Sequence, residues 1–287
     1  GLRLLAALVV CVLAGWAVRN IHLARQLDQS AQQSRHRIEF YRMSLDSLLT
    51  RNASLPRIIA LEDRLKDLLR DPSGRKRLDA ANSYLLDVKN MADLNAVFLM
   101  DQAGLTLAAS NFQFPGSYVG HNYRYRPYFQ AAMEGRLGTF YGVGVTTGEP
   151  GYFLAAPIEG EGQGAIGAVI VKISLEDFEA ALARSGDPVL LIDANGVVIL
   201  ASLPELKYHY LMPLGSHALQ QIELSRQYGA QNLHPLGMNL RLQDGPQRVR
   251  AALARATTCV TWTFVASSPV QTTIRAARSM PAVRRSS

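Results

Sequence analysis

The feature that most constrains the fold is a pattern that occurs twice, about 90 residues apart. Residues 97–104 form a short apolar run that ends in Asp-x-x-Gly, and residues 189–196 repeat this arrangement. A second apolar run follows each copy, at 105–110 and at 197–202. Two apolar runs joined by a Gly-containing turn predict an antiparallel hairpin. A period this long does not suit a solenoid, so the pattern predicts two similar α+β modules in tandem.

Further strands and helices complete this outline. The strands expected around the two hairpins cover residues 138–145, 152–157, 165–174, 248–254 and 261–267. Short helices are expected at 127–134, 175–184 and 271–280.

The N-terminal residues 1–18 are expected to form a membrane signal anchor. The uninterrupted apolar stretch 4–18 has 15 residues, somewhat fewer than the roughly 17–25 of a spanning helix. A cleaved signal peptide and a buried core helix are the alternatives. Either membrane interpretation places the following residues outside the cytoplasm. The arginines after the run favour the opposite orientation, but long domains translocate largely regardless of such charges.

Residues 19–91 are expected to form a long helical stalk and shorter helices, the last of them at 75–91. One face of the stalk carries apolar side chains at steps of three and four residues, namely Ile38, Tyr41, Leu45 and Leu48. Such a face can pack on the chain's own core, or it can also pair two chains in a parallel dimer. The pattern leaves both possibilities open.

Composition excludes several classes of protein. Apolar residues are 48% and charged residues 18%, which rules out a disordered or fibrous chain. The net charge of +7 suits an anionic partner such as nucleic acid, a membrane surface or a small acid. Two cysteines, Cys11 and Cys259, cannot build a disulfide framework or a four-ligand zinc site. No metal site and no cofactor are expected, and the basic segments are too short for a nucleic-acid surface.

Residues 162–167 match G-x-G-x-x-G literally. The dinucleotide-binding fingerprint requires a strand before it and a helix after it. Here a strand follows, so the motif predicts a hairpin loop instead of a nucleotide site.

The densest cluster of polar and aromatic residues is the segment 121–129. Pro127 is well placed as the first residue of a helix, which puts Arg126 at the helix N-terminus beside exposed N–H groups. A guanidinium there can clamp a carboxylate through two parallel hydrogen bonds. The alternative is that Arg126 pairs with a structural acid while the tyrosines fill a core.

A second group of polar residues comes from a loop and a strand. Thr146-Thr147-Gly148 lies between two expected strands, where hydroxyl and backbone N–H groups can converge. Lys172 interrupts an apolar strand, and alternation places it on the face of Ala168 and Ile170. A lysine on an inward face needs an anionic partner. One Arg, one Lys and two Thr suit a small dicarboxylate, whereas the alternative for Lys172 is an edge strand protected from aggregation.

Four segments together resemble the double-Cache sensor region of C4-dicarboxylate sensor histidine kinases. They are Ala109-Ser110-Asn111, Val119-Gly120-His121-Asn122-Tyr123-Arg124-Tyr125-Arg126-Pro127-Tyr128-Phe129, Gly144-Val145-Thr146-Thr147-Gly148 and Val171-Lys172-Ile173. Residues 193–198 and Trp262-Thr263 resemble the same family, so the resemblance covers most of residues 20–275. The Arg-Pro-Tyr-Phe block is common to many Cache sensors, and its combination with Thr-Thr-Gly and the late Lys is more specific.

The resemblance implies an α+β fold with a long N-terminal helix and two tandem PAS-like modules built on antiparallel sheets. Residues 92–184 would form the membrane-distal, ligand-binding module and residues 185–268 the membrane-proximal one. Residues 269–287 would form a C-terminal helix and a truncated tail.

The resemblance also implies a set of ligand-binding residues: Tyr123, Arg126, Tyr128, Thr146, Thr147, Gly148, Tyr152 and Lys172. Tyr123 and Arg126 would contact a carboxylate, the loop residues would contact other polar groups, and Lys172 would complete the charge neutralisation. The ligand would be a small organic acid, with a C4-dicarboxylate expected.

The expected function is therefore the extracytoplasmic sensing region of a two-component sensor histidine kinase. The chain would lie in the bacterial inner membrane with its bulk in the periplasm, as a homodimer through the N-terminal helix and without nucleic acid. The kinase domains of the family have no counterpart in this sequence, so the chain itself is not expected to catalyse phosphorylation.

Three alternatives stay open. The first is the sensor of a chemoreceptor or a diguanylate cyclase that binds an amino acid, which needs a carboxylate for the ammonium group, and the motifs supply none. The second is a secreted hydrolase, for which no nucleophile stands beside a positioned base. The third is a ligand-free dimerisation module. The preferred interpretation requires the cations of Arg126 and Lys172 to converge across a small cavity, without each being paired to an acid of the same fold.

Overall fold

The computed structural model describes residues 36–162, 164–185, 189–236 and 263–266, with the isolated positions 15, 16, 19 and 22. The elements below belong to one compact unit, Ile38–Ala266, and a second unit comprises Gly1–Arg37 with Ser267–Ser287. The segments expected as the anchor, most of the stalk before residue 36, the strand at 248–254, the helix at 271–280 and the tail lie outside the described residues. Within the described part, no helix is both long and apolar enough to cross a membrane.

A helix over residues 36–52 opens the described fold. Its buried side chains are Ile38, Tyr41, Leu45 and Leu49. The expected Leu48 packs against the same core but is only partly buried, whereas Leu49 is buried, because three helical turns advance about 11 residues from Ile38. Three helices follow, namely α2 (Leu55–Ile59), α3 (Asp63–Arg70) and α4 (Arg75–Met91). The helix predicted at 75–91 is thereby confirmed.

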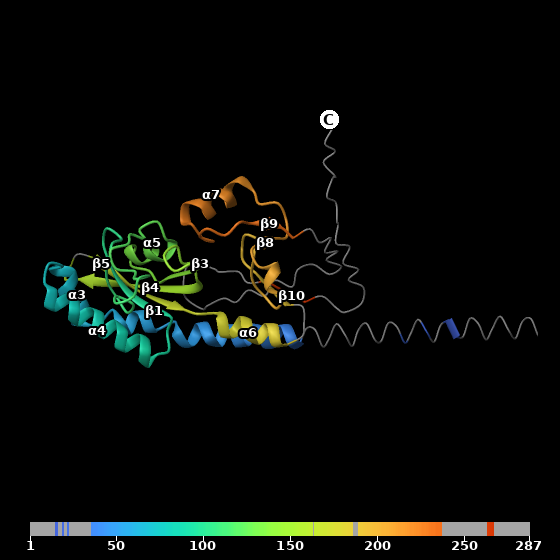
Figure 1. The fold of residues 1–287 in the computed structure, drawn as a ribbon, viewed down its shortest axis with the longest axis horizontal. Coiled ribbons are helices and arrows are strands. Elements are labelled where there is room, and N and C mark those ends of the chain that lie inside the picture. Colours follow the sequence, from blue (N-terminus) through green and yellow to red (C-terminus); the bar gives the residue numbers. More distant parts are fainter. Residues whose placement is uncertain are drawn as a thin grey trace, which may run out of the picture. The chain divides into compact units, whose positions relative to one another are not determined.

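A five-stranded antiparallel sheet forms the centre of the unit, with the order β2-β1-β5-β4-β3. Its strands are β1 (Ala96–Asp101), β2 (Thr106–Ala109), β3 (Gly138–Val143), β4 (Pro150–Gly160) and β5 (Gly164–Ile173). Helix α5 (Pro127–Met133) covers one face, and the N-terminal helices cover the other (Figure 1). Both faces are therefore buried, with alternate residues of each strand in two different core clusters.

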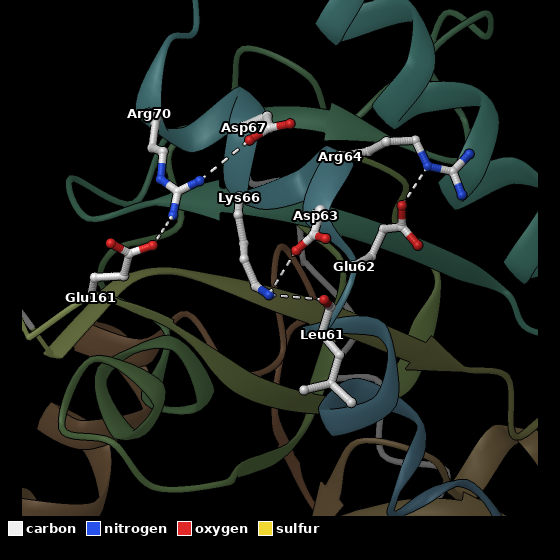
Figure 2. Close-up of polar contacts among 8 residues, drawn as sticks. All are labelled: Leu61, Glu62, Asp63, Arg64, Lys66, Asp67, Arg70 and Glu161. Atoms are coloured by element: carbon white, nitrogen blue, oxygen red, sulfur yellow. Dashed lines mark hydrogen bonds and ion pairs between the residues drawn. The ribbon is translucent and has the colours of Figure 1, made fainter.

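Helix α3 carries a row of exposed ion pairs, shown in Figure 2. Arg70 lies between Asp67 of its own helix and Glu161 of the β4–β5 hairpin, at 3.3 Å from each. Lys66 contacts Asp63 at 3.0 Å and also the carbonyl of Leu61. Exposed pairs of this kind contribute about 0–1 kcal/mol each. The buried leucines of α3, not these charges, hold the helix on the sheet.

A second, smaller sheet follows helix α6 (Glu176–Arg184). It has the order β10-β6-β7 and consists of β6 (Val189–Ile192), β7 (Val198–Ala201) and β10 (Thr263–Ala266). Beside it lie the short helix η1 (Pro204–Leu206), helix α7 (Ser216–Ser225), and the parallel pair β8 (His209–Tyr210) and β9 (His234–Pro235). Strand β10 confirms the strand expected at 261–267.

The repeated sequence pattern is also a repeated structure. The carboxylate of Asp101 accepts a hydrogen bond from the N–H four residues later at 2.9 Å, and that of Asp193 does the same at 3.1 Å. Gly104 and Gly196 close the two turns at φ angles of 83° and 81°, a conformation that costs glycine little and other residues more. Both predicted hairpins, β1–β2 and β6–β7, are confirmed.

The strand ends of the two hairpins match as well. The hydroxyl of Ser110 accepts a hydrogen bond from the N–H of Val97 at 3.0 Å, and that of Ser202 accepts one from the N–H of Val189 at 2.9 Å. The expected hairpin loop at the G-x-G-x-x-G motif is confirmed too, since Gly162 lies in the turn between β4 and β5.

The two sheets share one continuous hydrophobic core, to which Tyr141, Leu191 and Tyr228 belong. Polar contacts reinforce the junction. The Tyr141 hydroxyl donates to the carbonyl of Ile199 at 3.2 Å, and the N–H of Val143 donates to the carbonyl of Gln227 at 2.8 Å. The end of β3 is thus attached to the segment that follows α7.

Candidate functional site

A narrow cavity lies on the α5 face of the five-stranded sheet. Its lining residues are Phe98, Tyr118, Tyr123, Arg126, Tyr128, Gly144, Val145 and Phe153. The centre of a water-sized sphere can occupy only about 10 Å³ of it, which is the space of about one water molecule. A larger ligand can enter only if the wall moves. Residues 144–149, which connect β3 to β4, form one side of this wall.

Stacked aromatic rings form the floor of the cavity. Phe98 and Tyr118 stack with their centroids 4.7 Å apart, and Tyr128 and Phe153 stack at 5.2 Å. The alternative interpretation of the tyrosines as core residues is therefore correct in part, because they both pack and line the cavity.

Tyr118 is a site residue that the sequence reasoning missed. It is 3% exposed, and its hydroxyl has no hydrogen bond of good geometry among the described residues, although the Thr147 hydroxyl lies near it. Burial raises the pKa of Tyr118 to about 12, opposed by the neighbouring Thr147 hydroxyl. Buried hydroxyl groups are normally hydrogen-bonded. The Tyr118 hydroxyl can therefore donate a hydrogen bond to a ligand or accept one from it. The signal was its position just before the aromatic cluster 121–129.

Tyr123 joins the aromatic cluster to the 144–149 loop. Its hydroxyl lies 2.5 Å from the Thr146 hydroxyl. Burial raises the pKa of Tyr123, so the phenol stays protonated near neutral pH. The structure therefore brings these two predicted site residues together.

Arg126 occupies the position before Pro127 at the start of α5, as predicted. Its side chain is 1% exposed and forms no ion pair with any acid among the described residues. The alternative, in which Arg126 pairs with a structural acid, is therefore wrong for the described residues. Instead, Nη1 donates to the carbonyls of Ser225 and Arg226 at 3.1 Å each, and Nη2 donates to that of Val143 at 2.7 Å. Three of the five guanidinium N–H groups are used in this way.

Lys172 lies in β5, between β1 and β4. The edge-strand alternative is wrong, because β5 is the central strand of the sheet. The predicted face is confirmed, since Ala168 and Ile170 belong to the core cluster on the α5 side. The Lys172 side chain is fully buried at 0% exposure. Burial lowers its pKa, and the nearby charge of Glu149 opposes this shift.

Glu149 provides the anionic partner that a buried lysine requires. Its Oε2 lies 3.2 Å from Lys172 Nζ, and the Thr147 hydroxyl lies 3.4 Å from the same nitrogen. Sequence reasoning missed Glu149, although it directly follows the Thr-Thr-Gly motif. Gly151 makes room for the lysine, because a Cβ there would lie 2.7 Å from Lys172 Cε.

The 144–149 loop is held by its own backbone. The N–H of Gly148 donates to the carbonyl of Gly144 at 2.7 Å, and the N–H of Gly144 donates to that of Glu149 at 2.9 Å. Gly148 has a φ of 72°, which favours glycine. Its N–H, expected to face a ligand, is thus bonded within the loop in this conformation.

Of two further predicted site residues, Tyr128 and Tyr152, only the first lies at the cavity. Tyr128 is fully buried in the cavity wall, where burial raises its pKa. Tyr152 belongs to the core cluster on the opposite face of the sheet, whereas its neighbour Phe153 lines the cavity. The structure therefore does not bring Tyr152 to the other candidate residues. No cluster of metal-ligating side chains exists within the described part of the chain.

Comparison with known proteins agrees with this architecture. The Cache domain model matches residues 19–277. The C4-dicarboxylate transport sensor protein DctB of Pseudomonas aeruginosa is 33% identical over 209 residues, which are 73% of this chain and 34% of the relative. The protein of the same name from Rhizobium meliloti is 29% identical over 230 residues, or 80% and 37% respectively. The chain thus spans about a third of the length of these relatives.

Among solved structures, the sensor domain of the V. cholerae histidine kinase DctB superposes with a TM-score of 0.72. The sequences are 23% identical, and the match covers 84% of this chain and 97% of that one. At this identity the likeness concerns the fold, which mixes helices with antiparallel sheet in both. Because the family model extends over most of the sequence, the chain belongs to the Cache domain family.

Proposed function

We propose that this chain is the sensing region of a two-component sensor histidine kinase and that it binds a small organic acid, with a C4-dicarboxylate as the best candidate. The observation that carries the proposal is Lys172, a fully buried cation in the central strand, on the face where Arg126 lines a cavity. The relatives described as C4-dicarboxylate transport sensors support the same ligand class.

The charges favour a dianion. A buried cation is costly unless it is paired. An apolar side chain would pack in the core as well as a lysine does, so packing alone does not explain a lysine at this position. Arg126 is buried as well and has no acidic partner among the described residues. Arg126 lines the cavity, whereas Lys172 lies on the same face of the sheet but is not among the lining residues, and Glu149 is its present partner. A ligand with two carboxylates would match both cations once one carboxylate replaces Glu149 on Lys172.

Hydrogen-bonding capacity supports the same ligand. The contacts of Arg126 leave two guanidinium N–H groups for a carboxylate. The Tyr118 hydroxyl, which lies near the Thr147 hydroxyl, adds another polar group. We therefore include in the proposed ligand set the residues Tyr118, Tyr123, Arg126, Tyr128, Thr146, Thr147, Gly148 and Lys172, and we omit Tyr152.

Binding requires a conformational change. A C4-dicarboxylate has at least eight non-hydrogen atoms and does not fit the space of about one water molecule. The wall formed by residues 144–149 would open to admit the ligand and close again on it. A ligand that prefers one of two conformations in this way shifts the population between them.

The route of the signal is part of the proposal. We treat the two sheets as tandem modules of an extracytoplasmic region anchored in the bacterial inner membrane, paired through the N-terminal helix. Arg126 lines the cavity and also bonds to the carbonyls of Ser225 and Arg226. A ligand on Arg126 would therefore alter the contact between the cavity and the end of α7.

An amino acid is the second candidate ligand. The sequence motifs supplied no carboxylate for an ammonium group, but the structure places Glu149 beside Lys172 and Thr147. A zwitterion could use Arg126 for its carboxylate and Glu149 for its ammonium. This alternative predicts binding of amino acids instead of dicarboxylates.

Isothermal titration calorimetry with succinate, malate, fumarate and a panel of L-amino acids tests the proposal. We expect heat and a raised melting temperature with at least one dicarboxylate. Lys172→Met should abolish this binding, while Arg136→Met, a change at an exposed arginine in the same module, should preserve it. No response to any dicarboxylate, or equal affinity in Lys172→Met, would contradict the proposed site.

A further inference from the structure

The two partners of the ion pair between Lys172 and Glu149 differ strongly in their exposure to solvent. The lysine side chain is 0% exposed, whereas the glutamate side chain is 51% exposed. Lys172 is held in the central strand of a sheet that is buried on both faces. Glu149 lies in the connection between β3 and β4 and reaches the ammonium from the solvent side. One partner is therefore fixed in the protein interior, and the other can return to water.

This difference in exposure determines which partner moves away when a ligand carboxylate binds beside the ion pair. Moving the Lys172 side chain would leave a cavity in the core, because its backbone is fixed between β1 and β4. Moving Glu149 only rehydrates a carboxylate that is already half in water. The ammonium also lies 3.4 Å from the Thr147 hydroxyl, which belongs to the same loop as Glu149. Glu176 adds a weaker, more distant attraction to Lys172.

The charge of the site depends on the same residue. Arg126 and Lys172 together carry two positive charges, and Glu149 neutralises one of them while it is in place. With Glu149 seated, the site matches a ligand of one negative charge. With Glu149 displaced, it matches a ligand of two. The glutamate therefore discriminates between ligands by charge.

We infer that Glu149 is a built-in counter-anion that occupies Lys172 until a ligand carboxylate replaces it, and that it thereby sets the affinity and charge selectivity of the site. This inference rests on the proposed function, because it presumes that a small carboxylate binds beside Lys172. It extends that function by assigning a competing, specificity-determining role to a residue outside the Thr-Thr-Gly motif.

The position of Glu149 links this exchange to the opening of the cavity. The loop that carries it also supplies Gly144 and Val145 to the cavity wall. Its far end is attached to the aromatic cluster through Thr146 and Tyr123. Displacement of the Glu149 side chain removes the contact of the loop with Lys172, while the contact of Thr146 with Tyr123 and the backbone hydrogen bond from Gly144 to Glu149 remain. Residues 144–149 can then swing outward without losing their attachment to the cavity.

The test compares the wild-type chain with Glu149→Gln, which keeps the shape of the side chain and removes its charge. Glu161→Gln is the matched control, because Glu161 is 95% exposed, pairs with Arg70 and lies at the turn between β4 and β5, whereas Lys172 lies near the other end of β5. Succinate titrations by calorimetry are run on all three proteins at constant ionic strength. We expect Glu149→Gln to bind succinate roughly tenfold more tightly, the order expected for losing a partly screened competing charge, and Glu161→Gln to bind as wild type does.

The possible outcomes are distinct. Equal or weaker succinate binding in Glu149→Gln, with binding in the wild type, overturns this inference and leaves the proposed function standing. Amino-acid binding that disappears in Glu149→Gln also overturns it, because the glutamate would then contact the ligand. If the wild type binds no dicarboxylate at all, the proposed function fails first. If Glu149→Gln folds poorly, Glu149→Asp is used instead, because its side chain is one methylene shorter and holds the carboxylate farther from Lys172. A smaller increase in succinate affinity is then expected.

Discussion

Arg126→Met is the most informative single perturbation of the fold around the cavity. Methionine keeps an unbranched apolar stem but removes every donor of the guanidinium. The carbonyls of Ser225, Arg226 and Val143 then lose a charged donor inside the protein. The change acts on the five-stranded sheet and on α7 at once, because two of these carbonyls end α7 and the third ends β3.

The size of the effect follows from these three contacts. A hydrogen bond to a charged group contributes about 1.5–3 kcal/mol, but the three contacts share one side chain and are not additive. We therefore expect a loss of about 3 kcal/mol in the free energy of unfolding. For a unit of this size, 1 kcal/mol corresponds to about 2–4 °C in melting temperature, so Arg126→Met should melt about 6–12 °C lower.

Thermal unfolding followed by circular dichroism measures this shift, without ligand and at neutral pH. The control is Arg136→Met, because Arg136 pairs only with Glu134 on the surface among the described residues and is 41% exposed. It should shift the melting temperature by about 1 °C or less. A decrease of less than about 2 °C in the melting temperature of Arg126→Met would refute the reasoning, since Arg126 would then not hold the end of α7 to the five-stranded sheet.

Three further changes test other parts of the account. Lys172→Met should raise the melting temperature by a few degrees, because it removes the cost of burying the lysine charge, while Glu149, whose side chain is 51% exposed, can return to water and is not left buried and unpaired; a lower melting temperature would contradict this. Gly151→Ala should destabilise by about 1–3 kcal/mol and weaken ligand binding in calorimetry, because the added Cβ would lie 2.7 Å from Lys172 Cε; unchanged affinity would count against the placement of Lys172. Burial raises the pKa of Asp193 above its ordinary value of 3.8, so the folded state binds more protons than the unfolded state above that pH. This carboxyl therefore contributes less stability as pH rises from about 3.8 through its folded pKa. In urea titrations, the unfolding free energy of Asp193→Asn relative to wild type should increase over that pH range. A difference that does not change with pH would exclude the effect.

Local periodicity was sufficient to predict much of the fold. The alternation of β5 placed Lys172 on the face of Ala168 and Ile170, and the two Asp-x-x-Gly turns placed both hairpins. Pro127 predicted the start of α5 with Arg126 just before it. These features depend on neighbours close in sequence or on a period of two residues, so a sequence expresses them directly.

The partners of the two cations could not be predicted in the same way. The acceptors of Arg126 include carbonyls about 100 residues away, at the end of a helix that no motif marks. The contact between Glu149 and Lys172 depends on how a loop folds back over the sheet. Such contacts arise from tertiary packing, which local patterns do not encode.

The position of Tyr152 could have been predicted. In an antiparallel pair, residues directly opposite each other share a face, and β4 pairs with β5 so that Phe153 is opposite Lys172. Tyr152 is opposite Ile173 and therefore faces the other side of the sheet. A register argument of this kind would have removed it from the candidate set.

The most direct test of the central claim is a crystal structure of the chain with succinate. The account predicts one succinate carboxylate on Arg126 and the other on Lys172, with the Glu149 carboxylate moved away from the ammonium. A succinate bound elsewhere, or one that leaves the contact between Glu149 and Lys172 intact, would contradict it.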